Sequence, residues 1–185
     1  MANNGQADRF PDKYLFGDSV KWKNWMSELL LTTCQICRAN HGKIYPIDAE
    51  EHLPIHVNGK CEMVPMRTKV AGTATDMGKN GVDAYLLEHG ELPGYYVTKE
   101  EARLANWESS VGNLATVLPQ KMIGGDIYKN RENKLPQVDG RIWYETDFNY
   151  VSGYRNDCRI VYSNDGLIFV SYDHMKTFYE IMKFN

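Results

Sequence analysis

The chain has 185 residues, enough for one sizeable domain or one domain with a small companion, and its net charge is −3. This charge argues against binding nucleic acid through bulk attraction, because residues 76–185 carry 12 Lys and Arg against 16 Asp and Glu. No run of about 18 apolar residues is present, so we expect no contact with a membrane.

The first seventy residues predict a small segment distinct from the rest of the chain. Val20–Leu31 favours a short helix, residues 32–66 favour irregular structure, and the small polar residues at 71–77 favour a linker. We therefore expect a segment at 1–70, the linker, and a larger domain at 78–185. The polar start MANNGQADRFPDKY lacks the apolar core of a secretory signal, so we expect any export to use a non-classical route.

Three of the four cysteines lie close together in the N-terminal segment, which is unlike a disulfide framework. Zn²⁺ in structural sites binds four Cys or His ligands. The predicted ligands of a structural zinc are Cys34, Cys37, His56 and Cys61. His41 and His52 are rival ligands, and a metal-free remnant of such a site is the equal alternative.

Beyond residue 78 the pattern predicts helices first. Gly81–His89 places apolar residues on one helical face, and Thr98 followed by Glu101 is a capping box that opens a helix at Lys99–Asn106. A third short helix is predicted near Asn113–Leu118.

Strand patterns follow the helices. Arg141–Val151 alternates between the two faces of a strand, and Asn164-Asp165-Gly166 joins Arg159–Ser163 to Leu167–Tyr172 as a hairpin. Met175–Phe184 favours a final strand. Helices followed by an antiparallel sheet predict an α+β fold.

Four residues in this last third suggest a reaction that needs no metal. Glu145 can accept a proton, Arg155 and Arg159 can stabilise a phosphorane, and His174 can protonate a leaving oxygen. The alternative is structural: Glu145 and Asp147 as acids neutralised by the arginines, with His174 an ordinary surface histidine. Residue types alone favour this alternative.

Several separated segments resemble the barnase-like microbial ribonuclease family, in order and without gaps, over residues 78–185. They are YYVTKEEARLANW, GNLATVLPQKMIGGDIYKNRENKLP, GRIWYETDFNYVSGYRNDCRIVYSNDGLI and YDHMKTF. The resemblance implies the fold of that family and an endoribonuclease that prefers to cleave 3′ of guanosine. It also implies transesterification to a 2′,3′-cyclic phosphate, then hydrolysis, with no cofactor.

The resemblance assigns roles by position. It implies Glu145 as general base, His174 as general acid, and cations around the phosphate at Lys99, Arg155 and Arg159. The substrate-binding residues that it implies are Asn130, Arg131 and Glu132 of a guanine-recognition loop, with Asp126 and Lys129. Asp147 matches a structural partner of an arginine. Met175 stands where the family commonly has a tyrosine, and Lys129 where a small polar residue is usual.

The stretch TTCQICRANHGKIYPIDAEEHLPIHVNGKCEMVPM resembles the end of a Mu F-like phage head protein, although Gly59 stands where a cysteine is usual. That resemblance implies a toxin used in bacterial competition, delivered by a phage-like route and acting in the cytoplasm of the target cell. We expect a monomer that acts on single-stranded RNA and binds an acidic, barstar-like inhibitor. The alternative is a zinc-binding structural or interaction protein of phage-head origin with an inactive ribonuclease-like domain.

Overall fold

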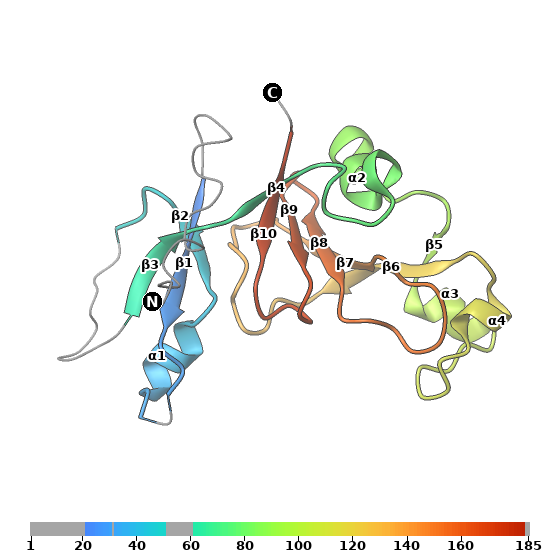
Figure 1. The fold of residues 1–185 in the computed structure, drawn as a ribbon, viewed down its shortest axis with the longest axis horizontal. Helices are drawn as coiled ribbons and strands as arrows, with labels where there is room; N and C mark the ends of the chain where they lie inside the picture. Colours follow the sequence, from blue (N-terminus) through green and yellow to red (C-terminus); the bar gives the residue numbers. More distant parts are fainter. Residues whose placement is uncertain (1–20, 31, 51–60, 184–185) are drawn as a thin grey trace, which may run out of the picture. The chain divides into compact units, whose positions relative to one another are not determined.

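A computed structural model describes residues 21–30, 32–50 and 61–183 (Figure 1). The chain forms two compact units. Unit 1 contains Met1–Thr68 with Arg131–Pro136, and unit 2 contains Lys69–Asn130 with Gln137–Asn185. His52 and His56 lie outside the described residues.

Unit 1 is built on a small antiparallel sheet with the strand order β2-β1-β3. Its elements are β1 (Trp22–Ser27), α1 (Gln35–Asn40), β2 (Ile44–Pro46) and β3 (Cys61–Pro65). The predicted helix at Val20–Leu31 is therefore wrong, as is part of the irregular structure predicted for 32–66. The reason is non-local pairing: Lys23 lies opposite both Tyr45 and Pro65, so hydrogen bonds to two partner strands override local helix preference.

Unit 2 carries a larger sheet with the order β4-β10-β9-β8-β7-β6-β5. Its strands are β4 (Thr68–Val70), β5 (Tyr96–Val97), β6 (Met122–Tyr128), β7 (Trp143–Asp147), β8 (Arg159–Ser163), β9 (Ile168–Ser171) and β10 (Tyr179–Met182). Neighbours from β6 to β10 pair antiparallel, and β5 pairs parallel with β6. The predicted hairpin appears as β8 and β9, and the final strand as β10.

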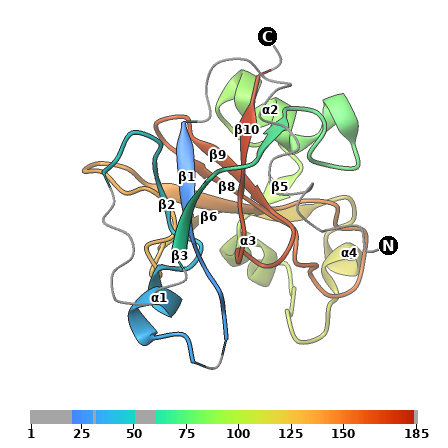
Figure 2. The same cartoon turned by 60° about the vertical axis from the view of Figure 1, so that its left-hand side comes forward.

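Short helices complete unit 2, as Figure 2 shows from a second side. They are the 3-10 turn η2 (Gly78–Asn80), α2 (Val82–His89), α3 (Lys99–Leu104) and α4 (Leu114–Val117). The capping box of α3 is present, since the Thr98 hydroxyl accepts from the Glu101 N–H and the Glu101 carboxylate accepts from the Thr98 N–H. The α+β prediction is confirmed.

Two clusters of apolar side chains hold these helices to the sheet. Val82 and Leu86 of α2 pack with Ile160, Val170 and Ile181 from three strands. A second cluster joins α3 and α4 to β6; its buried members are Ala102, Trp107, Leu114 and Ile123. Through Ala102 and Ile123, the second cluster packs α3 against β6, the strand that carries part of the site described below.

Residues 71–77 are packed into unit 2 rather than forming the predicted free linker. The fully buried Asp83 carboxylate accepts hydrogen bonds from the N–H groups of Gly72 (2.7 Å) and Ala74 (3.0 Å) and from the Thr75 hydroxyl (3.2 Å). A buried carboxylate is unstable without such donors, so this segment has a defined place. None of the helices in the described part of the chain is long and apolar enough to cross a lipid bilayer.

Candidate active site

A β-bulge aligns two carboxylates on adjacent strands. The register between β6 and β7 shifts at Gly124 and Asp126, so that Asp126 lies opposite Glu145. Gly125 has φ +89°, a conformation that glycine adopts without strain, and a Cβ on Gly124 would lie 2.2 Å from Thr146 Oγ1. The pair of glycines is therefore required for the bulge that brings these carboxylates together.

The first residue of α3 joins both carboxylates. The Lys99 side chain forms an ion pair with Glu145, and the Lys99 backbone N–H donates to the Asp126 carboxylate at 3.1 and 3.3 Å. A lysine at a helix N-terminus is unfavourable for the helix dipole, and the Asp126 carboxylate at the same terminus offsets it. The side chains of Lys99 and Glu145 are 25% and 14% exposed, so this pair remains partly accessible to solvent.

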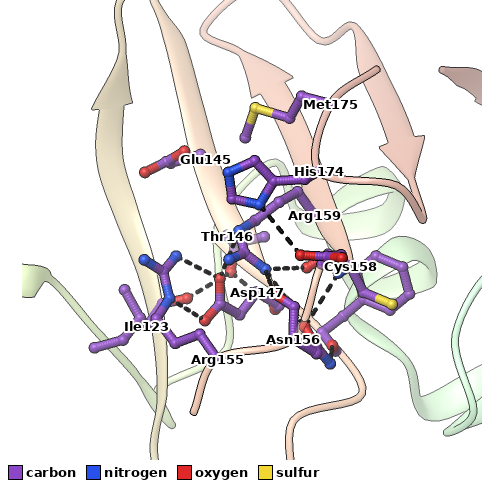
Figure 3. Close-up of polar contacts among 12 residues, drawn as sticks. Ile123, Glu145, Thr146, Asp147, Arg155, Asn156, Cys158, Arg159, His174 and Met175 are labelled. Carbon is purple, nitrogen blue, oxygen red and sulfur yellow. Dashed lines mark hydrogen bonds and ion pairs between the residues drawn. The ribbon is translucent and has the colours of Figure 1, made fainter. Parts of the chain in front are cut away.

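A buried aspartate holds the two arginines (Figure 3). Arg155 donates from Nε and Nη2 to the two oxygens of Asp147, both at 2.6 Å, and Arg159 Nε lies 3.1 Å from Asp147 Oδ1. The Asp147 side chain is 1% exposed. Arg159 also donates from Nη1 to the carbonyls of Asn156 (2.6 Å) and Cys158 (2.7 Å), which leaves its guanidinium little freedom.

Burial and charge act differently on the two guanidinium groups. Burial lowers the pKa of Arg155, but the hydrogen bonds and charge of Asp147 outweigh it, and the net pKa is raised. Burial also lowers the pKa of Arg159; Asp147 raises it, the positive charge of Arg155 lowers it again, and the net pKa falls. Both arginines stay cationic, because the ordinary pKa of arginine is far above neutrality.

His174 lies on a tight turn after β9. Its φ is +57° and that of Met175 is +63°, and the turn is braced by the Ser171 hydroxyl, which donates to Asp173 Oδ1 and accepts from the Met175 N–H at 2.8 Å. The imidazole is 67% exposed, and its Nδ1 lies 3.5 Å from Asp157 Oδ1. Sequence reasoning missed Asp157: it lies in the quoted segment between Arg155 and Arg159, but an exposed acid there has no pattern that sets it apart from an ordinary surface residue.

The predicted guanine-recognition loop crosses the boundary between the units. Asn130 ends the first part of unit 2, is 6% exposed and has a left-handed φ of +44°. Arg131 and Glu132 belong to unit 1, where Glu132 Oε2 lies 2.9 Å from Lys134 Nζ. Lys129 is exposed. Within unit 2, the structure thus brings together Lys99, Asp126, Glu145, Asp147, Arg155 and Arg159.

The cysteines of unit 1 interact with one another. Cys34 Sγ accepts from the Cys37 N–H (3.4 Å), Cys61 Sγ lies 3.3 Å from the Ser27 hydroxyl, and hydrogen bonding to Cys61, with burial and Cys34, raises the pKa of Cys37 to about 12. His41 Nδ1 accepts from the Ser27 N–H at 3.1 Å, so that nitrogen is not open to a metal. Within residues 21–30, 32–50 and 61–183, no group of three or more His, Cys, Asp or Glu is arranged to hold a metal ion. The zinc site stays a prediction.

Comparison with known families identifies the larger part of the chain. A family model described as ribonuclease matches residues 80–182, more than half of the sequence. The chain belongs to this ribonuclease family. The enzyme class is thus ribonuclease, with RNA as the substrate, and ribonucleases of the barnase type need no cofactor for cleavage.

Three ribonucleases illustrate how close the match is. The ribonuclease of Bacillus pumilus is 44% identical over 133 residues, which are 72% of this chain and 82% of the relative. Those of Heyndrickxia coagulans and Bacillus intermedius are each 51% identical over 102 residues, 55% of this chain, and these residues cover 94% and 63% of the relatives. The longest match extends to residues before 80. The resemblance of residues 1–70 to a phage head protein stays a prediction.

Proposed function

We propose that this ribonuclease cleaves RNA internally, preferably 3′ of guanosine, with Glu145 as general base and His174 as general acid. The observation that carries the proposal is the contact network of Lys99, Glu145 and the two arginines held by Asp147. It provides an acceptor for a proton and three cations for a phosphoryl group, from groups that are already oriented.

In the first step, Glu145 takes the proton of the 2′-hydroxyl while the 2′-oxygen attacks phosphorus. Negative charge then passes from the carboxylate to the phosphoryl oxygens. Lys99, paired with Glu145 beforehand, loses its partner at that moment and can stabilise the new charge. The cation is therefore most useful in the transition state, where its interaction lowers the barrier.

The arginines are pre-oriented for the same task. Each uses two of its nitrogens on Asp147 or on backbone carbonyls. In the described part of the chain, Arg155 Nη1 and Arg159 Nη2 make no hydrogen bond to protein and remain for phosphate. Since little side-chain freedom is left to lose, substrate binding need not order these groups.

His174 completes the reaction by protonating the 5′-oxygen as its bond to phosphorus breaks. In the slower second step the roles reverse: His174 removes a proton from water, and Glu145 returns the proton it accepted, giving a 3′-phosphate. An imidazole side chain can donate a proton in the first step and accept one in the second. DNA has no 2′-hydroxyl and should bind without being cleaved.

Guanine preference would come from residues 130–132. Backbone N–H groups there can donate to guanine O6, and the Glu132 carboxylate can accept from the base N1–H and N2–H. Glu132 would have to leave Lys134, which is inexpensive because the Glu132 side chain is 72% exposed.

The decisive experiment is to map RNA cleavage products with and without EDTA. Cleavage after guanosine that persists in EDTA, with a cyclic phosphate intermediate, supports the proposal. Glu145→Ala and His174→Gln should each reduce the rate by about 10²–10⁴-fold. Glu88→Ala and His89→Gln change the same residue types on α2 and should have no effect. Full activity in Glu145→Ala or His174→Gln would contradict the catalytic role proposed for that residue. An inactive pure wild type would favour the zinc-binding structural protein.

We further propose that the chain is a toxin delivered to target cells by a non-classical or phage-like route, and that an acidic, barstar-like inhibitor protects the producer. The support is chemical: an unchecked ribonuclease harms its own cell, and the guanidinium nitrogens that Arg155 and Arg159 leave for phosphate can equally bind the carboxylates of an acidic partner. Expression of the wild type without an inhibitor should arrest growth, whereas Glu145→Ala should not. Equal toxicity of both would contradict a role for RNA cleavage.

A further inference from the structure

A carboxylate lies against the imidazole of His174. Two contacts join the residues: Nδ1 is 3.5 Å from Asp157 Oδ1, and the His174 backbone N–H donates to the Asp157 carbonyl at 3.0 Å. The dashed line from the ring in Figure 3 marks the side-chain contact, and the other ring nitrogen lies on the side of Glu145. The pair thus connects the loop before β8 with the turn after β9.

The backbone on both sides of Asp157 is anchored. The Asn156 amide donates to the carbonyls of Phe148 (2.9 Å) and Asn149 (3.0 Å), and its oxygen accepts from the Cys158 N–H at 3.1 Å. Arg159 donates to the carbonyls that flank Asp157. Most exposed ion pairs are weak because two long side chains must be ordered. Here two short side chains meet because their backbones are already held together.

We propose that Asp157 is a positioning residue for His174, an inference that rests on the proposed role of His174 as general acid. The carboxylate lies 3.5 Å from Nδ1 of the protonated ring, and this ion pair favours one ring orientation. This leaves Nε2 as the nitrogen that delivers the proton to the 5′-oxygen. A carboxylate on one imidazole nitrogen commonly sets which tautomer the other nitrogen presents to the reaction.

Whether Asp157→Asn raises or lowers the cleavage rate distinguishes a positioning role of Asp157 from a purely electrostatic one. Asp157 is a negative charge near groups that bind phosphate; its charge acts on Arg159, as does that of Glu145. Electrostatics alone predicts that Asp157→Asn strengthens RNA binding and speeds cleavage. Positioning predicts a lower kcat, by about two- to five-fold given the exposure of the pair, with an unchanged or lower KM.

The nature of the leaving group identifies the step that is affected. A guanosine dinucleotide needs a proton on its departing 5′-oxygen, whereas guanosine 3′-(4-nitrophenyl phosphate) releases a phenolate that is stable without one. Asp157→Asn and His174→Gln should both lose more activity on the dinucleotide than on the nitrophenyl ester. A structural disturbance of the site would reduce both rates equally.

The matched control is Glu88→Gln, since the Glu88 side chain is 77% exposed and that of Asp157 72%. It should leave both rates unchanged. If Asp157→Asn equals the wild type, or is slowed equally on both substrates, the inference is overturned while the proposed function stands. If His174→Gln shows no dependence on the leaving group, the general-acid assignment fails, and the inference fails with it. Circular dichroism confirms that each variant is folded.

Discussion

Replacing Asp147 by Asn should destabilise unit 2 far more than a chemically identical change at another arginine-paired aspartate. Asp147 is 1% exposed and is the shared anion of Arg155 and Arg159. Asn keeps the shape but removes the charge and one acceptor. Two largely buried guanidinium groups then lack a counter-ion, and losing one partner of a buried ion pair typically costs about 3–5 kcal/mol.

Asp165→Asn is the matched control. Arg141 donates to Asp165 from Nε (2.9 Å) and Nη2 (2.7 Å), a geometry as good as that at Asp147, but the Asp165 side chain is 43% exposed. Water reaches the Asp165 carboxylate, so the expected cost is smaller, about 1 kcal/mol, even though the Arg141 side chain is only 10% exposed. The difference between the two variants therefore measures burial rather than the chemistry of the substitution.

Urea unfolding of the full chain measures both costs. Since two units can unfold in separate transitions, the transition that abolishes ribonuclease activity is the one to compare. The slope m should be unchanged, and the midpoint of Asp147→Asn should fall well below that of Asp165→Asn. In thermal unfolding, each kcal/mol lost from the free energy of unfolding should lower Tm by about 4–8 °C for a domain near 100 residues. Equal costs for the two variants would refute the argument from burial.

Further predictions concern the turn, the bulge, base preference and zinc. Burial raises the pKa of Asp173, but hydrogen bonds from Thr177, Ser171 and Lys176 outweigh it and the net pKa is lowered. The ionised Asp173 carboxylate therefore stabilises the folded state above its unfolded pKa near 4, and this stabilisation is lost as pH falls through the lower folded-state pKa. The free energy of unfolding of Asp173→Asn should accordingly depend less steeply on pH in acid. Gly125→Ala, at φ +89°, should destabilise by about 1–3 kcal/mol and slow cleavage. Glu132→Gln should reduce the kcat/KM preference for guanosine dinucleotides over adenosine ones. Metal analysis of the purified chain should find about one zinc, and less in Cys34→Ser, if the predicted site is real; no zinc in either would exclude it.

Local signals predicted much of unit 2. The capping box at Thr98 and Glu101, and the Asn164-Asp165-Gly166 turn, are each stabilised within a few residues, so the sequence is enough to find them. The prediction of a helix at Val20–Leu31 was wrong because the apolar spacing of this segment fits a helix and a strand equally well. Pairing with β2 and β3, which lie later in the chain, decides between them.

Local sequence patterns were also insufficient to assign roles within the candidate site. Glu145 and Asp147 lie two apart on β7, and the sequence offered both as acids on one face. Only burial separates them: Asp147 is closed off beneath two arginines, while Glu145 keeps 14% of its side chain exposed. Residues 71–77 were misread for a related reason, since their N–H groups serve a buried carboxylate, Asp83, that no local pattern reveals.

The charge balance of the network explains how an acidic domain can still act on RNA. Lys99, Arg155 and Arg159 are matched by three carboxylates in the same network, Asp126, Glu145 and Asp147. In the resting state the cluster is therefore close to neutral, and it should attract RNA weakly, with a shallow dependence on salt. When Glu145 accepts a proton, one cation loses its counter-charge just as the phosphoryl oxygens become more negative. The network is then complementary to the transition state more than to the substrate, which favours catalysis over tight binding.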